Sequence, residues 1–361
     1  MSSSGLITQN FKFMTKDNKH QKLSESTDTA IAYSTCYRQY GINVLSLFDG
    51  MSCGQIALEK LGIKVNNYFA SEIDKYAIQV TKDNYPNTKH IGDVTQVKES
   101  NLPNIDLLIG GSPCQGFSFA GKQLNFEDPR SKLFFEFVRL LKECKPKYFL
   151  LENVKMKKEY QEVISRYLGV EPIEINSSLV SAQNRKRLYW TNIPGVEQPE
   201  DKGILLEDIV EDGGVLKEKS QTILSTIYKE NAKSMFTRNK QGLLVVCGAM
   251  RGRYIVDGKR QDGKMLTKGL TKQRIEIRYD GKTNALTTVA KDNNVCYEAD
   301  GRPYYEIDGI RFRKLTPIEC ERLQTVPDNY TSSVSNTQRY KMLGNGWTVD
   351  VIVHIFNYAQ W

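Results

Sequence analysis

The sequence is poor in the residue that enzymes most often use for acid–base and metal chemistry. Its 361 residues include three histidines, His20, His90 and His354, and none of them stands at a spacing typical of a zinc site or a Ser-His-Asp triad. Seven scattered cysteines without a CxxC pair argue against a disulfide framework and a zinc cluster, and indicate reduced thiols. We therefore expect no bound metal, and we assign any acid–base chemistry to carboxylates.

Long apolar runs are scarce as well. Runs such as YFLL, at residues 148–151, are far shorter than the roughly 18 residues that a membrane span needs, and the N-terminus has no apolar signal segment. A hydrophobic content of 40% with 25% charged residues is typical of a globular protein. These features predict a soluble, cytoplasmic protein with no membrane partner.

Acidic residues are depleted from one segment in particular. The whole chain carries a net charge of +8, yet residues 229–282 alone hold fourteen Lys or Arg against five Asp or Glu, a net charge of +9. A charged run by itself is compatible with a solvated surface. Its concentration in one segment, interleaved with Tyr254 and Tyr279, favours contact with a polyanion such as nucleic acid.

From residue 42 onward, short apolar strands alternate with segments of helical period. Strands are expected at residues 42–48, 67–71, 106–111, 147–152, 173–180 and 187–193, and helices at residues 52–61, 74–84, 131–144 and 157–168. Alternation of this kind is typical of βαβ units. It predicts an α/β fold with a doubly wound, mostly parallel sheet.

The regular alternation ends near residue 194. We expect residues 1–40 to form a flexible N-terminal extension, residues 41–194 the first part of the main domain, residues 195–312 a smaller, mainly β domain, and residues 313–361 the closing part of the main domain. Helix signals return there in TPIECERLQ and TVDVIVHIFNYAQ. The similar stretches QTILSTIYKEN and TNALTTVAKDN, at residues 221–231 and 283–293, are interpreted either as two related strands or as a chance match.

Ligands of an open parallel sheet bind beyond the carboxyl ends of its strands. The residues at those ends form a glycine loop, two separate acids, and a thiol with a carboxylate. They are Phe48, Asp49 and Gly50, then Glu72, then Asp93, then Pro113 and Cys114, and finally Glu152 and Asn153.

The glycine loop and the acids predict a nucleoside site. An acid about twenty residues after a glycine loop is typical of sites in which the acid binds ribose hydroxyls. FDGMSCG lacks the full GxGxxG, and the chain has no GxxxxGK[ST], so a dinucleotide or a triphosphate is poorly supported. An adenosyl ligand without phosphates fits better, with Glu72 on the ribose and Asp93 near the adenine.

Cys114 stands after a proline in GGSPCQGFSF, beyond the apolar run in which a structural cysteine would pack. A lone cysteine is often structural and Glu152 alone could be a surface acid, but a thiol and a carboxylate beside an adenosyl site suit one reaction. A thiolate that adds to C6 of cytosine, while a carboxylic acid gives a proton to N3, makes C5 nucleophilic enough to attack a sulfonium methyl group.

Eight blocks of sequence, in order from about residue 43 to the C-terminus, resemble the DNA cytosine-5 methyltransferase family. They are FDG with Gly54, SEID, GDV, GSPCQGFSFAGKQ, LENV, QNRKRLYW, RKLTPIECERLQTVPDNY and LGNGWTVDVI. SLFDGMSCG and GWTV are most similar to the animal de novo type. The resemblance implies a class I S-adenosylmethionine-dependent fold, S-adenosylmethionine as methyl donor, and a flipped-out cytosine as substrate.

The resemblance also implies roles for individual residues. Cys114 would be the nucleophile and Glu152 would engage N3, while Arg187 would contact the cytosine and Arg185 would anchor the site. The positions that match S-adenosylmethionine-binding residues of the family are Phe48, Gly50, Glu72, Asp93, Val94, Pro113 and Asn345. Further candidate cofactor contacts are Asp49, Ile73 and Trp347.

Two positions of the chain depart from the family pattern. Ile73 stands where the family often has an aromatic residue that stacks on adenine, so that contact is expected to be weaker. Ser52 replaces the second glycine of F-x-G-x-G. Trp347 is interpreted either as compensation for this loss, packed near the cofactor, or as an ordinary core aromatic.

Contacts with DNA are expected from two regions. Residues 116–132 resemble the loop that closes over the flipped base, and they include Ser118, Lys122 and Gln123. The small domain occupies the target-recognition position. Its candidate contacts are Arg251, Arg253, Lys259, Arg260 and Lys264 on phosphates, and Thr287 and Thr288 on a strand facing the DNA, where β propensity alone is the other explanation.

The sequence therefore predicts a monomeric enzyme that methylates C5 of cytosine within a specific sequence of double-stranded DNA, of the restriction-modification type, in a bacterial or phage-infected cell. A tRNA cytosine-5 methyltransferase and a catalytically idle DNA-binding protein on the same fold remain alternatives. The large basic insert favours duplex DNA, and intact Cys114, Glu152 and Arg187 argue against an idle protein. A thiol hydrolase is disfavoured, because no histidine stands at a recognisable partner position.

Overall fold

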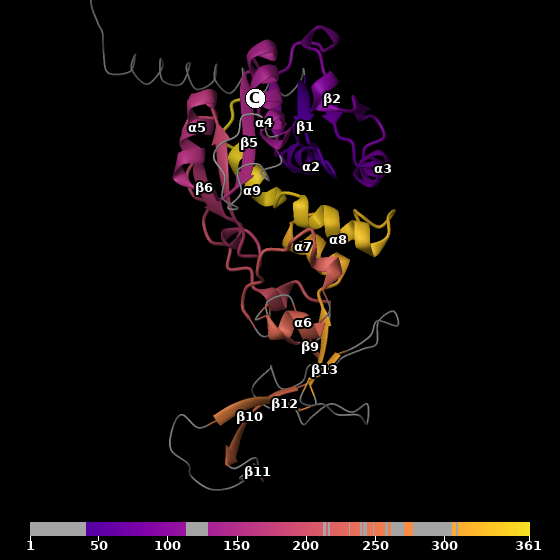
Figure 1. Cartoon of the computed structure of the whole chain (residues 1–361), viewed down its shortest axis with the longest axis vertical. Coiled ribbons are helices and arrows are strands. Elements are labelled where there is room, and N and C mark those ends of the chain that lie inside the picture. The colour runs from indigo at the N-terminus through magenta and orange to yellow at the C-terminus, as the bar shows by residue number, and fades with distance from the viewer. Residues whose placement is uncertain are drawn as a thin grey trace, which may run out of the picture.

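The computed structural model describes residues 41–112 and 129–211, most of residues 214–256, and residues 259–260, 271–276, 305–307 and 310–361. The 1–40 extension lies outside these ranges, so its flexibility stays a prediction. Figure 1 shows a large layered part that contains the main sheet, and a smaller part that contains β10, β11 and β12; helices α6, α7 and α8 lie between them.

A seven-stranded sheet forms the centre of the large part, with strand order β3-β2-β1-β4-β5-β7-β6. Strands β1 to β5 pair in parallel, and β7 runs antiparallel to both of its neighbours. The bounds are β1 Ile42–Leu47, β2 Val65–Ser71, β3 Lys89–His90, β4 Leu107–Gly110, β5 Tyr148–Val154, β6 Ile173–Asn176 and β7 Lys186–Thr191. The predicted mostly parallel, doubly wound sheet is confirmed.

Both faces of this sheet are buried, which explains why its strands are continuous apolar runs. Neighbouring residues of one strand enter different clusters: Val44 packs in one core and Leu45 in the other, and Tyr189 and Trp190 divide in the same way. A strand that alternates between two dry faces must be apolar at nearly every position. The sequence therefore shows a run where a half-exposed strand would show alternation.

Helices cover each face. Buried residues of α2 (Cys53–Lys60), α3 (Lys75–Asn84) and α9 (Val349–Phe356) belong to one cluster, and those of α4 (Pro129–Cys144) and α5 (Lys158–Leu168) belong to the other. All five lie where the sequence predicts helices. Two further helices, α6 (Ala232–Thr237) and α8 (Asn336–Asn345), were not predicted.

The part between β7 and α7 contains two small sheets. One has the order β11-β10-β12 and the other β13-β14-β9-β8. The bounds are β8 Gly214–Val215, β9 Leu244–Cys247, β10 Ala249–Val256, β11 Lys259–Arg260, β12 Thr271–Glu276, β13 Tyr305–Ile307 and β14 Ile310–Lys314. The interpretation of residues 221–231 as a strand is wrong, because this stretch holds a 3-10 helix at Ile227–Lys229. The similar stretch at residues 283–293 lies outside the described residues.

The chain re-enters the large part through α7 (Pro317–Leu323). Thr316 caps this helix, and the Glu319 side chain returns to the Thr316 backbone in a capping box. Glu319 is fully buried and forms a two-pronged ion pair with Arg313 of β14, with N–O distances of 2.8 and 2.7 Å. The pair joins the small β13-β14-β9-β8 sheet to α7. The division of the chain into domains stays a prediction.

Among the helices of the described ranges, none has both the length and the hydropathy needed to cross a bilayer.

Substitution of Gly344 tests how tightly α8 is packed. A Cβ atom at this position would lie 2.2 Å from the backbone nitrogen of Ser225. Helix propensity alone predicts that Gly344→Ala stabilises the protein by about 1 kcal/mol. We expect the clash to dominate and the free energy of unfolding in urea to fall by about 2 kcal/mol or more. Thr337 is exposed on the same helix, and Thr337→Ala should change the free energy of unfolding by less than about 0.5 kcal/mol. A Gly344→Ala protein as stable as wild type, or more stable, would contradict the close packing.

Candidate functional site

The loop after β1 turns sharply enough to leave open space above its backbone. Phe48, Gly50 and Ser52 all have positive φ angles, of 56°, 59° and 63°. A Cβ atom on Gly50 would meet nothing within 4 Å, so the loop leaves room at this position for a ligand to approach the main chain. The expected glycine loop is therefore present at the carboxyl end of β1.

Ser52 adopts the left-handed conformation that favours glycine, and its side chain stabilises the turn. Its hydroxyl donates to the carboxylate of Asp49 at 2.5 Å and accepts from Gln55 Nε2 at 2.9 Å. The other Asp49 oxygen accepts from the hydroxyl of Tyr68, on β2, at 2.8 Å. Burial raises the pKa of Asp49 to about 6, against the opposing effect of these hydrogen bonds. An Asp–Ser pair thus holds the turn where the family pattern has a second glycine.

Glu72, at the end of β2, is held by backbone donors. Its Oε2 accepts from the Gly50 amide at 2.8 Å, and its Oε1 accepts from the amides of Ile73 and Asp74 at 2.7 and 2.8 Å. A carboxylate oxygen has two lone pairs, so Oε2 keeps the capacity to accept from a ligand hydroxyl as well. This geometry suits the expected ribose contact beside the open space at Gly50.

Lys341, on α8, extends this network to the returning part of the chain. Its Nζ lies 2.8 Å from Asp74 Oδ2, and the other Asp74 oxygen caps α3 through the amide of Tyr76. Burial opposes ionisation of Asp74, but the hydrogen bond and charge of Lys341, together with backbone hydrogen bonds from Tyr76 and Ala77, outweigh it and lower the pKa of this carboxyl. The residue was not predicted from the sequence. An exposed lysine in a polar helix gives no signal of its partner.

The expected adenine side of the site is open. Ile73 is an exposed large hydrophobic residue, with 76% of its surface accessible. Asp93 is exposed and binds Thr95 through the backbone amide and the hydroxyl, both at 2.9 Å, while Val94 is buried. The second Asp93 oxygen remains able to accept a hydrogen bond, and an exposed apolar side chain and such an acceptor are both suited to a flat heterocycle with an exocyclic amine.

Gly111, next to the end of β4, lies against two of the predicted site residues. A Cβ atom here would lie 3.0 Å from Trp347 Nε1 and 3.4 Å from Glu152 Oε2. The hydroxyl of the following residue, Ser112, is buried with no hydrogen-bond partner among the described residues. The structure thus brings Glu152 and Trp347 together at the point where the chain leaves β4 towards Cys114.

Glu152 and Arg187 form an ion pair in which both side chains are mostly buried. Arg187 Nε lies 3.0 Å from Glu152 Oε1, with side-chain exposures of 12% and 10%. The antiparallel register of β5 and β7 pairs Val154 with Arg187 and Glu152 with Tyr189, so the pair lies diagonally on one face of the sheet. The sequence predicted that both residues belong to the site, and the strand register explains how they meet.

Arg185 is buried, with 2% of its surface exposed. Its guanidinium donates to the carbonyls of Ile223, Gly344 and Gly346 at 3.2, 3.2 and 2.9 Å, while its Nε has no partner among the described residues. Burial, with a further contribution from Arg187, lowers its pKa to about 10. Asn345, between the two glycines, is exposed at the end of α8. Arg185 therefore fixes the loop that presents Asn345, which fits the expected anchoring role.

Several predicted residues lie outside the described residues: Pro113, Cys114, Ser118, Lys122, Gln123, Lys264, Thr287 and Thr288. Only the backbone is described for Arg251 and Arg253 on β10, and for Lys259 and Arg260 on β11.

The thiols of Cys53 and Cys144 are unsuited to nucleophilic attack. Burial raises their pKa values to about 12 and about 11. Cys320 is fully buried and its pKa is raised as well. A thiol that stays protonated is a poor nucleophile. These three cysteines do not compete with Cys114 for the expected role.

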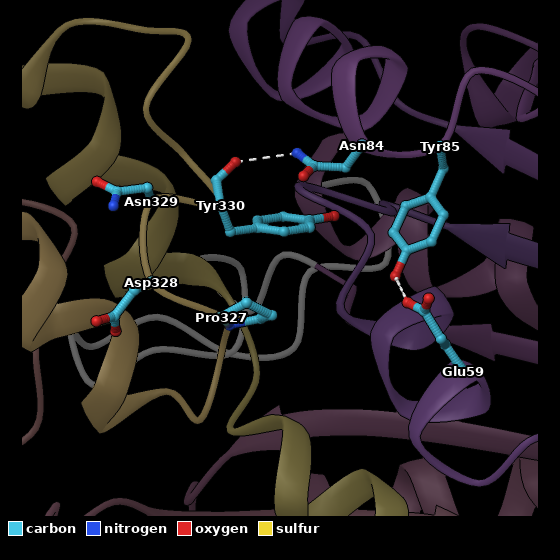
Figure 2. A pocket seen from close by; sticks show the side chains of 7 residues that line it. All are labelled: Glu59, Asn84, Tyr85, Pro327, Asp328, Asn329 and Tyr330. Carbon is cyan, nitrogen blue, oxygen red and sulfur yellow. Dashed lines mark hydrogen bonds between the residues drawn. The ribbon is translucent and has the colours of Figure 1, made fainter.

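A separate hollow of about 280 Å³ lies at the opposite ends of α2 and α3 from the glycine loop (Figure 2). Glu59, in the last turn of α2, accepts from the Tyr85 hydroxyl at 2.6 Å. Tyr330, in the wall of the hollow, donates to the backbone oxygen of Met51 at 2.8 Å. Tyr330 thus contacts the loop after β1 from the side of the hollow. None of the predicted site residues lines the hollow.

Three features of the described residues are compatible with the expected adenosyl ligand. They are the open backbone at Gly50, the Glu72 carboxylate and the exposed Ile73. No cluster of three or more metal-ligating side chains occurs among the residues that the structure describes.

Comparisons with known proteins agree with this geometry. A family model described as C-5 cytosine-specific DNA methylase matches residues 42–168 and 176–361. The type II methyltransferase M1.ScrFI of Lactococcus lactis subsp. cremoris is 32% identical over 329 residues, which cover 86% of this chain and 75% of the relative. The type II methyltransferase M.HhaI of Haemophilus parahaemolyticus is 30% identical over 339 residues, with 87% and 93% covered.

The fold is also similar to solved structures. The methyltransferase EhMeth of Entamoeba histolytica superimposes with a TM-score of 0.58, at 15% identity, over 88% of this chain and 97% of that one. At this identity the likeness supports the fold alone, and it agrees with the predicted class I methyltransferase architecture.

The Lys341–Asp74 pair leads to a testable expectation for cofactor binding. Lys341→Met removes the charge that orders the Glu72 loop, but the pair is partly exposed, so the effect should be small. We expect the dissociation constant of S-adenosylhomocysteine, measured by calorimetry, to rise about 2–3-fold at low salt and to approach wild type at 1 M salt. Lys60→Met removes the Lys60–Asp350 pair, which also has a 2.8 Å contact, and should leave the constant unchanged. Equal effects of both variants would show that Lys341 acts only on stability.

Proposed function

The chain belongs to the C-5 cytosine-specific DNA methylase family, and from that membership we propose that it methylates cytosine within a specific sequence of double-stranded DNA through a covalent enzyme–base adduct. S-adenosylmethionine is the methyl donor that this family and fold imply. The observation that carries the proposal is the buried Glu152–Arg187 pair facing Gly111, three residues before Cys114.

The chemistry assigned to the chain's own residues balances as follows. The Cys114 thiolate would form a bond to C6 of cytosine as Glu152 delivers a proton to N3, and C5 would become enamine-like. When bound, S-adenosylmethionine would supply an electrophilic methyl group and leave as S-adenosylhomocysteine. After C5 has taken the methyl group, its proton is lost to solvent, and the Cys114 thiolate leaves C6 as N3 returns its proton to Glu152, which restores the ring. A stacked base cannot undergo this addition, so the target cytosine must leave the duplex.

Arg187 has a second role in this scheme. Without a base, its Nε is paired with Glu152 at 3.0 Å. Entry of cytosine would transfer Arg187 from Glu152 to the base carbonyl. Glu152 would then be released to contact N3 of the same base.

The register of the β11-β10-β12 sheet supports binding to a polyanion. Arg251 and Arg253 of β10 are paired with Arg274 and Lys272 of β12, and Arg260 of β11 is paired with Ile255. Residues two apart and directly paired residues share a face, so these five basic positions lie on one face, with Glu276 at its end. Like charges at paired positions destabilise a sheet unless a counter-charge covers them. The phosphate backbone of DNA supplies one.

Covalent trapping tests the assigned nucleophile. Bisulfite sequencing of host DNA after expression first identifies the methylated base and its sequence context. Duplexes with 5-fluorocytosine at that position should then form a complex with the wild-type protein that survives denaturing electrophoresis, because the fluorine cannot leave C5 as a proton does. Cys114→Ser should bind the same duplex without trapping it, since a hydroxyl is a much weaker nucleophile than a thiolate.

Three outcomes would contradict this proposal. Trapping by the serine variant, or a cross-linked peptide with another cysteine, would reassign the nucleophile. Absence of methylated DNA together with activity on tRNA in a parallel assay would replace DNA as the substrate. Absence of activity on both, with cofactor binding intact, would support an idle DNA-binding protein.

The basic face makes a prediction for salt dependence. Arg253→Gln and Arg260→Gln should each reduce the slope of log K for DNA binding against log salt by about 0.9, the value for one phosphate contact. Lys259→Gln is the matched control. Lys259 neighbours Arg260 but is paired with Val256, which places it on the opposite face of the same sheet. A loss of slope at Lys259 with none at Arg253 and Arg260 would place DNA on the other face.

A further inference from the structure

A cup of about 240 Å³ lies where the large part of the molecule meets the small β13-β14-β9-β8 sheet. Its apolar wall consists of Leu224, Ile227 and Met235, and its polar residues are Gln221, Thr222, Glu230 and Lys240. Leu224 is 47% exposed, which is unusual for a large apolar residue, whereas Ile227 and Met235 are buried. The cup is smaller than the roughly 300–1,000 Å³ sites of drug-sized ligands, so it suits a small ligand group.

One acceptor of a residue that lines this cup has no hydrogen-bond partner among the described residues. Glu230 Oε1 accepts from Lys240 Nζ, but Glu230 Oε2 is buried and has no partner among the described residues. A buried polar atom without a partner costs about 1–3 kcal/mol. A ligand that brings an N–H donor to Oε2 would recover that energy, and the ammonium of Lys240 would donate to a neighbouring carbonyl or ring nitrogen of the ligand.

The wall of the cup is fixed to the candidate active site. Thr222 Oγ1 donates to the Asn184 carbonyl at 2.7 Å, and Ile223 binds Arg185 through its own carbonyl at 3.2 Å. These contacts align residues 220–223 with the turn that leads directly into β7 and Arg187. The cup therefore adjoins the place where the target cytosine is proposed to bind.

We propose that this cup receives one unstacked nucleobase of the DNA next to the target cytosine, with Glu230 accepting from a base N–H. This inference rests on the proposed function, because it requires DNA as the substrate. A phosphate is excluded as the occupant by charge, since the unsatisfied atom is a carboxylate oxygen. A nucleobase combines a flat apolar face, suited to Leu224 and Met235, with an edge on which donors and acceptors alternate.

A variant series on base-deleted DNA tests the proposal. Duplexes that contain the methylated sequence are made with one abasic site at each position in turn, and DNA affinity is measured for each. Glu230→Gln keeps the shape of the side chain but can turn an amide donor towards the base, so we expect about tenfold weaker binding of intact DNA. At one position, the abasic duplex should bind the wild-type and Glu230→Gln proteins equally.

Leu224→Ala, which trims an exposed part of the wall, should weaken binding several-fold and lose its effect at that same abasic position. Glu218→Gln, at an exposed glutamate outside the cup, should match wild type throughout. Unchanged binding of S-adenosylhomocysteine shows that each variant is folded.

The outcomes separate the two claims. If the wild-type protein methylates DNA but Glu230→Gln and Leu224→Ala bind every duplex as it does, the cup takes no base while the proposed function stands. If the loss of affinity persists at all abasic positions, the cup acts on stability and not on a base. If the wild-type protein neither binds nor methylates DNA, the proposed function fails and the cup proposal fails with it.

Discussion

The arrangement of the candidate site depends on one buried cation. Arg185 stands in the turn before β7, and its guanidinium binds the carbonyls of Ile223, Gly344 and Gly346. These carbonyls belong to the segment that leaves the large part and to the helix end that returns to it. Arginine suits this position because its planar fork satisfies several acceptors at once and stays charged even when burial lowers its pKa to about 10. A buried cation is costly, and it is tolerated here because carbonyl dipoles surround it.

A neutral network continues from that cation and fixes the register of the returning chain. Gln324 Nε2 donates to the Leu343 carbonyl at 2.6 Å, and its Oε1 accepts from the Thr348 hydroxyl at 2.9 Å. Thr348 in turn accepts from Ser177 at 2.8 Å. All these polar groups are buried, so a shift of one residue would leave several of them unsatisfied. Asn345 and Trp347 are therefore held in one defined position at the end of α8.

The sequence was informative where a physical period or a chemical motif is local. Apolar runs predicted the strands because both faces of the sheet are dry. The expected strand ends were correct for Glu72, which follows β2, but wrong for Glu152 and Asn153, which lie within β5 because that strand continues to Val154. Helix α8 was not predicted because its buried face includes Arg339 and Tyr340, so no apolar stripe marks it. The burial of Arg185 could not be predicted either, since a turn rich in Asn, Arg and Lys is typical of a solvated surface. The common face of the basic residues follows only from the register of three strands.

The late return of the chain to its own sheet also determines when the protein can fold during synthesis. Helix α9 packs with α2 in the cluster that covers one face of the sheet, and its last residue is Phe356. Until that residue has left the ribosome, Val44 and its neighbours on this face have no complete cover. The nascent chain must therefore keep a half-finished sheet in contact with water while more than a hundred residues of the small part are made. The same topology allows the intervening segment to change in length at a small entropic cost, because both of its ends are fixed on the finished core.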